Sequence, residues 1–481
     1  MQTKSNKNIY VVSFFEGAAV MATELCGSKL IAPYFGSSLY VWASVIAVTL
    51  GSLAGGYFFG GRLSLAKNNV KTLSLILFIA AMYMGVMPFI VNLFGPIALR
   101  FGLMFSVTLS SFLLLSVPMF LMGAASPLII SIQTKNPEES GRVSGLVYSI
   151  STLGGIISTF LCGFLFIPTF GINITLFVFA SLLTLSLVLL HKSNGFKATV
   201  LLLMLLVSGF TSKTPIKNCI YESDGMLGKI NVIDDTTGNS VIRKLLVNNT
   251  VQSEMDMQNG QSVSQYIALL DSNLSKVQNK KALVLGMGGG LTSNLLAMKG
   301  YSVTGVELDE RIIEAAKKYF HLSANTNAIA DDARRFINNC HNKFDLVLID
   351  VFKAEEQPVH VITTESLKRL AENLEENAYL IINWHGYLKG ERGLGTSILL
   401  NTLKSAGFNY KMVAASHKED ERNILIFTSA KSPAVKKYEI QEAIEVSDLI
   451  NTDAKPLLEK YNALANQTWR KNYILYYYSA N

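Results

Sequence analysis

The chain has 481 residues, enough for two or three domains, and 50% of them are hydrophobic. Its net charge of +7 lies entirely in residues 1–212, with eleven Lys or Arg against four acids; the other 31 basic and 31 acidic residues cancel. Positive charge placed between apolar runs is typical of membrane proteins and argues against a nucleic-acid partner. The four cysteines show no metal-ligand spacing, so we expect neither a disulfide framework nor a metal site.

Apolar runs fill the first 212 residues. A helix that spans a bilayer needs about 20 such residues. We predict six spans: Tyr10–Leu25, Leu39–Phe59, Thr72–Phe94, Leu103–Met122, Gly145–Ile167 and Asn173–Leu190. A seventh run, Phe196–Phe210, is short and either spans the membrane or lies at its interface. Basic residues occupy alternate loops, which predicts an integral protein of the inner or plasma membrane. If the seventh run lies at the interface, which is the interpretation we favour, the C-terminal domain is cytoplasmic.

Two features of this half go beyond hydropathy. Glycines crowd 51–61 and 154–163, a pattern typical of closely packed helices. Glu16 and Glu24 lie within about 80° of each other on one helical face. An acid inside a bilayer is a candidate substrate-binding residue, although an ion pair such as Glu24 with Lys29 is the alternative.

After residue 212 the pattern changes to that of a soluble fold. Lys229–Asp235 and Val241–Val247 flank a turn and predict a β-hairpin or small meander. From Lys281 strands alternate with helices, for example Glu310–Phe320 and Thr364–Leu374, as in doubly wound α/β folds. Strands are expected at Ala282–Leu285, Ser302–Val306, Ala328–Ala330, Asp345–Asp350, Ala378–Asn383, Tyr410–Val413 and Asn423–Thr428. We therefore expect a helical membrane bundle (1–212), a small β domain (213–265) and a Rossmann-like nucleoside-binding domain (266–481).

A glycine turn marks the expected nucleoside site. Gly286, Gly288 and Gly290 follow the first strand, where glycine lets the backbone approach a ligand closely. The G-x-G-x-G spacing is typical of S-adenosylmethionine folds. Glu307 ends the next strand, where an acid can bind both ribose hydroxyls.

Two further acids follow later strands. Asp332 ends the third strand and either accepts from an adenine amino group or caps a helix. Asp350 ends the apolar strand that begins at Asp345, a place where acids often carry chemistry. Together with the glycine turn and Glu307, these acids predict a nucleoside-binding site.

The soluble half resembles the spermidine synthase (polyamine aminopropyltransferase) family. The resemblance rests on Asn248–Ser253, whose Gln252 matches the end of a strand turn of that family, on the turn and acids above, and on Thr452–Pro456. It implies that Glu307 binds the ribose, that Asp332 binds the adenine and that Asp350 is the general base. It also implies a substrate-site tyrosine at Tyr266. The membrane half is similar to that of membrane-fused spermidine synthase-like proteins, through Phe14–Gly17, Pro33–Trp42 and Met122–Leu128.

The sequence departs from this family at two acids. The family turn carries an Asp that holds the aminopropyl ammonium of decarboxylated S-adenosylmethionine, and Gly289 stands there. A second family Asp, three residues after the base, contacts the amine acceptor, and Lys353 stands there. A cation in place of an anion disfavours a dicationic acceptor.

Three functions therefore stay open. The first is aminopropyl transfer from decarboxylated S-adenosylmethionine to an amine, with Asp350 as base. The second keeps intact S-adenosylmethionine as donor, for methyl transfer, aminocarboxypropyl transfer or cleavage. The third is an amine transporter or sensor whose soluble half binds nucleoside. The expected partners are the bilayer and a small acceptor; a homodimer is left open, with Tyr476–Tyr478 as a candidate contact.

Overall fold

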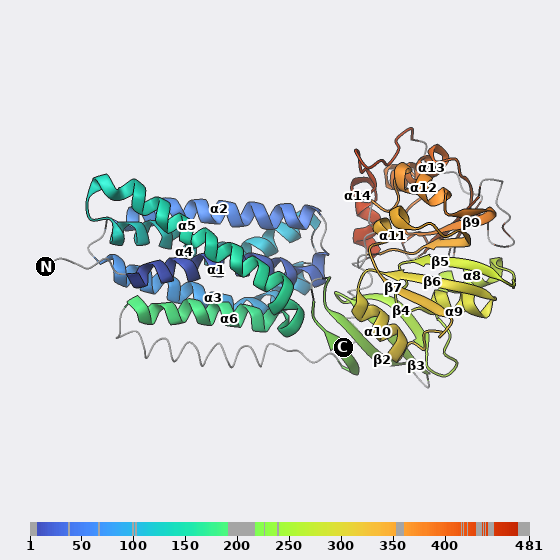
Figure 1. The fold of residues 1–481 in the computed structure, drawn as a ribbon, viewed down its shortest axis with the longest axis horizontal. Helices are drawn as coiled ribbons and strands as arrows, with labels where there is room; N and C mark the ends of the chain where they lie inside the picture. Colours follow the sequence, from blue (N-terminus) through green and yellow to red (C-terminus); the bar gives the residue numbers. More distant parts are fainter. Residues whose placement is uncertain are drawn as a thin grey trace. The chain divides into compact units, whose positions relative to one another are not determined.

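We analysed a computed structural model of the chain (Figure 1). The structure describes residues 7–36, 39–65, 68–98, 101, 103–190, 217–225, 227–237, 240–352, 360–414, 416, 418–420, 422–429, 435, 437, 439–440 and 447–469. The chain divides into two compact units, Met1–Pro215 with Ser223–Lys229 and Ile216–Glu222 with Ile230–Asn481. The predicted run Phe196–Phe210, Lys353 and the Tyr476–Tyr478 cluster lie outside the described residues.

The first unit is a bundle of long apolar helices. They are α1 (Lys7–Phe35), α2 (Leu39–Leu63), α3 (Asn69–Ala98), α4 (Leu103–Gln133), α5 (Ser140–Leu161) and α6 (Ile167–Leu190), with a short π-helical turn, η2 (Cys162–Phe166), between the last two. Five stretches of the described helices are long and apolar enough to cross a membrane, which indicates an integral membrane protein. The fifth, Pro137–Ser186, is 50 residues long and leaves helical geometry at Gly171 (φ 80°, ψ 174°). The predicted spans Gly145–Ile167 and Asn173–Leu190 lie on either side of this break.

Small residues set the closest helix contacts, as predicted. A Cβ on Gly56 would lie 2.2 Å from the carbonyl oxygen of Phe120, so α2 and α4 meet backbone to backbone. A Cβ on Gly154 would likewise lie 2.1 Å from the carbonyl oxygen of Phe14, where α5 meets α1. At this second contact Glu16 is buried and accepts a 3.0 Å hydrogen bond from Ser151. Glu24, on the same helix, is half-buried.

The second unit begins with a four-stranded antiparallel sheet. Its strands are β1 (Cys219–Ser223), β2 (Ile230–Thr237), β3 (Ser240–Val247) and β4 (Thr250–Asp256), in that order. The predicted hairpin is the central pair β2–β3, and two further strands flank it. A register shift between Leu245 and Leu246 distorts the β3–β4 ladder just opposite Val251 and Ser253. This irregularity lies beside the residues of β4 that line the site described below.

The larger sheet has seven strands in the order β10-β11-β9-β8-β5-β6-β7. The strands are β5 (Lys280–Leu285), β6 (Tyr301–Glu307), β7 (Thr326–Ala330), β8 (Phe344–Ile349), β9 (Leu374–Trp384), β10 (Asn409–Ala414) and β11 (Ile424–Ser429). The first five are parallel, whereas β11 pairs antiparallel with β9 and β10. This mixed strand order confirms the doubly wound, S-adenosylmethionine methyltransferase-like fold. The direction in which successive strands are added reverses between β5 and β8, and such a reversal leaves a ligand crevice at the carboxyl ends of the strands.

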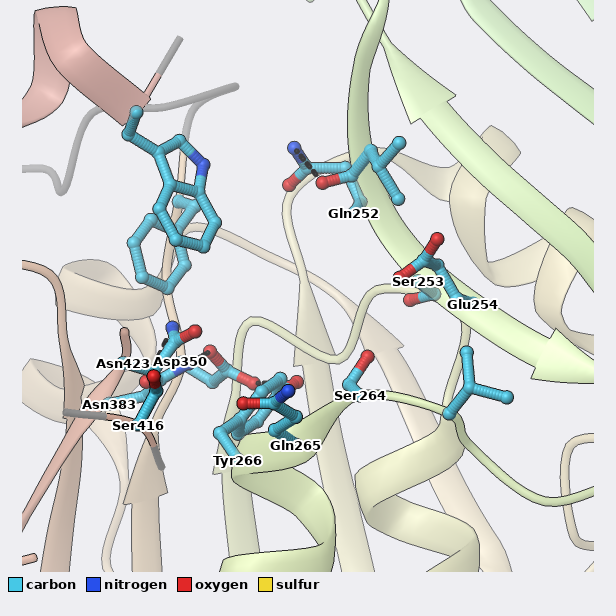
Figure 2. Close-up of a pocket in the computed structure, with 14 residues that line it drawn as sticks. Gln252, Ser253, Glu254, Ser264, Gln265, Tyr266, Asp350, Asn383, Ser416 and Asn423 are labelled. Carbon is cyan, nitrogen blue, oxygen red and sulfur yellow. Dashed lines mark hydrogen bonds between the residues drawn. The ribbon is translucent and has the colours of Figure 1, made fainter. Parts of the chain in front are cut away.

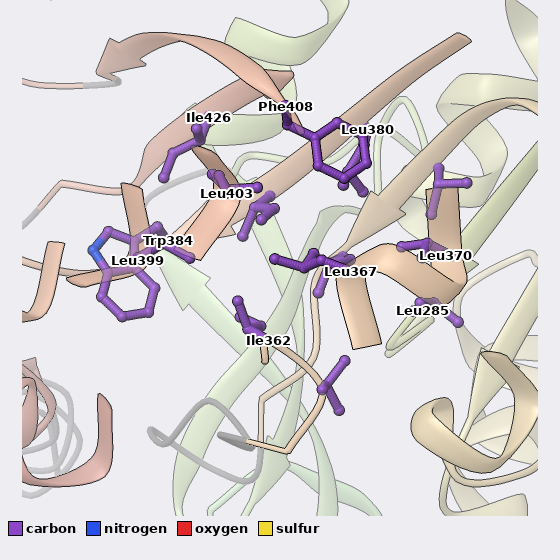
Figure 3. Packing of buried hydrophobic residues seen from close by; sticks show 14 of the residues in the cluster. Leu285, Ile362, Leu367, Leu370, Leu380, Trp384, Leu399, Leu403, Phe408 and Ile426 are labelled. Atoms are coloured by element: carbon purple, nitrogen blue, oxygen red, sulfur yellow. The ribbon is translucent and has the colours of Figure 1, made fainter. Parts of the chain in front are cut away.

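Alternating side chains divide the core between the two faces of this sheet. In β5, Leu283 and Leu285 pack in one cluster, whereas Ala282 and Val284 pack in the other. The first face is covered by α11 (Ala333–Asn339), α12 (Thr364–Ala371) and α13 (Leu394–Ser405), as Figure 3 shows for part of the cluster. The second is covered by α8 (Gln265–Asn273), α9 (Leu291–Met298) and α10 (Glu310–Tyr319). Helices on both faces fix the strand ends that carry the site.

In the soluble half, the predicted end of one helix falls inside a strand. The helix expected at Thr364–Leu374 ends at Ala371, and Leu374 instead begins β9. Leu374 pairs with Phe344 across a register irregularity, so the sheet takes a residue whose local sequence also suits a helix. Tertiary pairing overrides propensity here.

Candidate active site

The glycine turn joins β5 to α9 with three left-handed glycines. Gly286, Gly288 and Gly290 have φ values of +83°, +54° and +80°. A Cβ on Gly286 would lie 2.3 Å from the carbonyl oxygen of Asp350, so only glycine fits beside the end of β8. The amide of Asp350 also donates to the carbonyl of Leu285 at 2.8 Å. The nucleoside turn and Asp350 are thus held together through backbone.

The carboxylate of Glu307 binds the backbone of the glycine turn through hydrogen bonds. It accepts hydrogen bonds from the amide of Gly288 at 3.0 Å and from that of Asp309 at 3.3 Å. Burial raises the pKa of the Glu307 carboxyl, and these backbone hydrogen bonds act in the opposite direction. The predicted ribose acid therefore lies against the glycine turn, as a nucleoside site requires.

Asp332 is the N-cap of α11. One carboxylate oxygen accepts from the amide of Arg335 at 2.9 Å, and the other lies 3.6 Å from Nε2 of His360. The capping role that the sequence allowed is therefore present. The cap uses one oxygen, which leaves the second oxygen facing the imidazole of His360.

Asp350 is held by two hydrogen bonds from side chains. The hydroxyl of Tyr266 donates to Oδ2 at 2.9 Å, and Nδ2 of Asn383 donates to Oδ1 at 2.8 Å. Burial raises the pKa of the Asp350 carboxyl to about 6, while the two hydrogen bonds pull it back. A carboxyl group with this pKa is ionised at neutral pH. Its pKa is also close to neutral pH, which is the condition under which a general base is most efficient.

A cavity of about 290 Å³ opens in front of Asp350 (Figure 2). Its described lining is Val251, Gln252, Ser253, Glu254, Val263, Ser264, Gln265, Tyr266, Asp350, Phe352, Asn383, Ser416, Asn423 and Trp469. Most of these side chains are uncharged and polar, and only Asp350 and Glu254 among them are acids. Glu254 lies 3.6 Å from the ammonium of Lys244, which also pairs with Asp235 at 2.8 Å. Gln252 and Tyr266, predicted from separate motifs, meet here with Asp350.

Ser253 connects the small sheet to the glycine turn. Its hydroxyl oxygen accepts from the amide of Gly289 at 2.9 Å. A Cβ on Gly289 would lie 2.9 Å from both the Cβ and the Oγ of Ser253. The side chain thus fills the space beside the turn and also lines the cavity.

The structure brings the predicted residues together in two groups. Tyr266, Asp350 and Gln252 share the cavity. The glycines and Glu307 form the turn behind it, and Asp332 lies at the end of β7. The predicted substrate residues Glu16 and Glu24 belong to the other unit.

Sequence reasoning missed three residues. Asn383 lies near the carboxyl end of β9, just after Ile382, which pairs with Ile349, so a polar residue at the end of this apolar strand is a detectable signal. Ser253 and Trp469 gave no such signal, because each comes from an element distant in sequence. The ring of Trp469 lies 4.2 Å from that of His385, centroid to centroid, which fixes this wall of the cavity.

Residues 262–437 match the model of the spermine/spermidine synthase domain. A probable polyamine aminopropyl transferase of Bifidobacterium longum is 25% identical over 175 residues, 36% of this chain and 38% of that one. An N-terminal histidine N-methyltransferase of Emericella nidulans is 32% identical over 129 residues, 26% of this chain and 23% of that one. The chain thus spans less than half of either relative.

Among solved structures, a probable spermidine synthase from Corynebacterium glutamicum is 18% identical with a TM-score of 0.39, covering 45% of this chain and 81% of that chain. The two sequence relatives transfer different groups, so they establish the superfamily of S-adenosylmethionine-dependent transferases. The C-terminal half of this chain therefore carries a spermine/spermidine synthase domain, preceded by long apolar helices.

Proposed function

We propose that the C-terminal half transfers an alkyl group from an adenosyl sulfonium to an amine, with Asp350 as general base. The observation that carries this proposal is the pair of hydrogen bonds that orient the Asp350 carboxylate toward a cavity large enough for a small acceptor. Aminopropyl transfer from decarboxylated S-adenosylmethionine is the form of this reaction that the resemblance implies.

The reaction is a nucleophilic substitution. The amine nitrogen attacks a carbon bound to the sulfonium sulfur, the N–C bond forms, and the C–S bond breaks with both electrons left on sulfur. The proton lost by the nitrogen passes to Asp350. Because a sulfonium is already a good leaving group, most of the acceleration has to come from positioning and from removal of that proton.

The donor is placed by the residues of the turn. In this proposal the glycine backbone lies against the nucleoside, Glu307 binds the ribose hydroxyls, and the outer oxygen of Asp332 accepts from the adenine. Gln252 lines the cavity from β4, together with Asp350. This order brings the sulfur toward Asp350, because Gly286 and Asp350 are in backbone contact.

We also propose that this domain works on the cytoplasmic side of a membrane. The supports are the basic residues at alternate loops of the bundle and the cytosolic supply of adenosyl sulfonium donors. The acceptor is then a small amine in the cytosol or at the membrane surface.

The test is turnover by the full-length protein in detergent, supplied with each donor and a panel of amines. Mass spectrometry identifies the nucleoside: methylthioadenosine shows that the propyl-bearing arm left the sulfur, and S-adenosylhomocysteine shows methyl transfer. Asp350→Asn should lower kcat by at least about a hundredfold while nucleoside affinity is kept.

Asp345→Asn is the matched control, because Asp345 lies at the opposite end of the same strand, where it pairs with Lys280 at 2.7 Å. Its turnover should match that of the wild type. Full activity of Asp350→Asn would remove Asp350 from the mechanism. Tight nucleoside binding without turnover of any donor would instead support a sensor or transporter.

A further inference from the structure

The amides of the glycine turn are already used within the protein. Gly286 and Met287 donate to the carbonyl of Val306, Gly288 donates to Glu307, and Gly290 donates to the carbonyl of Met287. The remaining amide, that of Gly289, donates to Ser253. The tail of a donor molecule beside this turn therefore has to be recognised by side chains.

Ser253 lines the cavity with a hydroxyl group that can donate a hydrogen bond. Its oxygen accepts from Gly289, and among the described residues no acceptor takes its hydroxyl proton. A serine hydroxyl carries one proton and two lone pairs. One lone pair is occupied by the Gly289 amide, and the proton is available to a ligand group that lies against this wall. Such a proton suits a carboxylate, because a hydrogen bond to a charged acceptor is the strongest that a hydroxyl makes.

The same residue keeps an acid out of the turn. A side chain on Gly289 would begin 2.9 Å from the Cβ of Ser253 and 3.4 Å from a ring carbon of Phe320, so an aspartate does not fit while Ser253 is in place. An ammonium group at the end of a donor tail would thus meet a neutral hydroxyl. Gly289 and Ser253 together therefore place a neutral hydroxyl, and no acid, at this part of the turn.

We propose that Ser253 makes the site selective for a donor whose tail carries a carboxylate, namely intact S-adenosylmethionine rather than its decarboxylated form. This inference rests on the proposed function for the site. With the intact donor, the substitution releases S-adenosylhomocysteine if the methyl carbon is attacked and methylthioadenosine if the 3-amino-3-carboxypropyl carbon is attacked. In both cases the electrons of the broken C–S bond stay on sulfur.

The first experiment measures binding, so it does not need turnover. Calorimetric titration of the full-length protein with S-adenosylhomocysteine and with its decarboxylated analogue compares two ligands that differ only in the carboxylate. The wild type should prefer S-adenosylhomocysteine. Ser253→Ala should reduce that preference by roughly tenfold to a hundredfold, the value of one hydrogen bond to a charged group.

Ser272→Ala is the matched control, since it removes a hydroxyl of the same domain that is not part of the described cavity lining and that donates to the carbonyl of Leu269 at 2.8 Å. Its affinity ratio for the two ligands should equal that of the wild type. A general structural effect of Ser253→Ala would weaken both ligands alike and would overturn the proposal. A wild-type preference for the decarboxylated analogue would overturn it as well.

The second experiment reverses the selectivity. The double variant Ser253→Gly with Gly289→Asp removes the obstructing side chain and supplies an acid, so the affinity ratio should shift toward the decarboxylated analogue. Gly289→Asp alone should weaken both ligands, because Ser253 still blocks the aspartate. If no donor is turned over while the predicted binding ratios hold, the proposed function fails and the assignment of Ser253 stands. Turnover restricted to the decarboxylated donor would support the proposed function and overturn the assignment of Ser253.

Discussion

Replacing Asp350 by asparagine should stabilise the fold at neutral pH even though it stops the reaction. The pKa of this carboxyl rises from 3.8 to about 6 because the group is buried. Each pKa unit corresponds to about 1.4 kcal/mol, so the ionised group costs at most about 3 kcal/mol of folding free energy above pH 6. Asparagine removes that cost and can still accept from Asn383, while the hydroxyl of Tyr266 can turn to accept from the new amide.

The pH dependence gives this prediction its sign. A raised pKa means that the wild type loses stability as pH rises from about 4 to about 6, where the unfolded chain ionises before the folded one. The advantage of Asp350→Asn should therefore be absent below pH 4, grow between pH 4 and 6, and stay constant above. Hydrogen exchange of amides in β8, followed by mass spectrometry of the full-length protein, measures it where the change is made.

Asp345→Asn on the same strand should behave in the opposite way. Hydrogen bonds from Lys280 and from the amide of Lys281 outweigh partial burial and lower the pKa of Asp345. The wild type thus gains stability from Asp345 above its usual pKa and loses it as pH falls, so this variant should exchange faster at neutral pH. The reasoning is refuted if Asp350→Asn exchanges faster than the wild type at pH 7.5, or if its effect does not depend on pH.

Two further predictions concern the same strand ends. Tyr266→Phe removes a hydrogen bond to the charged form of Asp350, so the lower midpoint of the pH profile of kcat/KM should rise by about one unit. Tyr221→Phe, at a tyrosine that packs on Tyr319 and is not among the described lining residues, should leave the midpoint in place. An unchanged midpoint in Tyr266→Phe would show that this tyrosine does not act on the base. Gly286→Ala puts a methyl group 2.3 Å from the carbonyl oxygen of Asp350 and forces a positive φ on alanine, so thermal melting should show a loss of at least about 2 kcal/mol of stability, together with weaker nucleoside binding. Gly407→Ala has a φ of +90° but open space around its Cβ, so it measures the cost of the backbone conformation alone. Equal losses of stability in the two variants would contradict the steric argument.

Three of the parallel strands were predictable because a short apolar run ends at a glycine or an acid, at Gly286, Glu307 and Asp350. In the observed order Glu307 and Asp350 stand at the ends of the two strands, β6 and β8, that flank β5, and the glycine turn follows β5 itself. The end of α12 was not predictable, because Leu374 is taken into the sheet by its pairing with Phe344. The local sequence around Leu374 does not reveal that its pairing partner is Phe344, thirty residues earlier in the chain.

The cavity wall was harder to predict than its base. Asp350 follows its own strand, but its orientation depends on Tyr266 and Asn383, which reach it from 84 and 33 residues away. Ser253 lies 36 residues from Gly289 and on a different sheet, so no spacing rule connects them. The sequence showed the missing acid at Gly289, and only the contact with Ser253 explains what replaces it.

The distant origins of the cavity wall also affect the order of events during synthesis. Gln252 and Trp469 line the same cavity, and 469 − 252 = 217 residues separate them. At about 5–20 residues per second, a ribosome needs roughly 10 to 40 s to add that segment. During this interval the apolar helices have already been made, whereas the cavity still lacks a wall. The proposed acceptor site therefore forms only after the long apolar helices are complete.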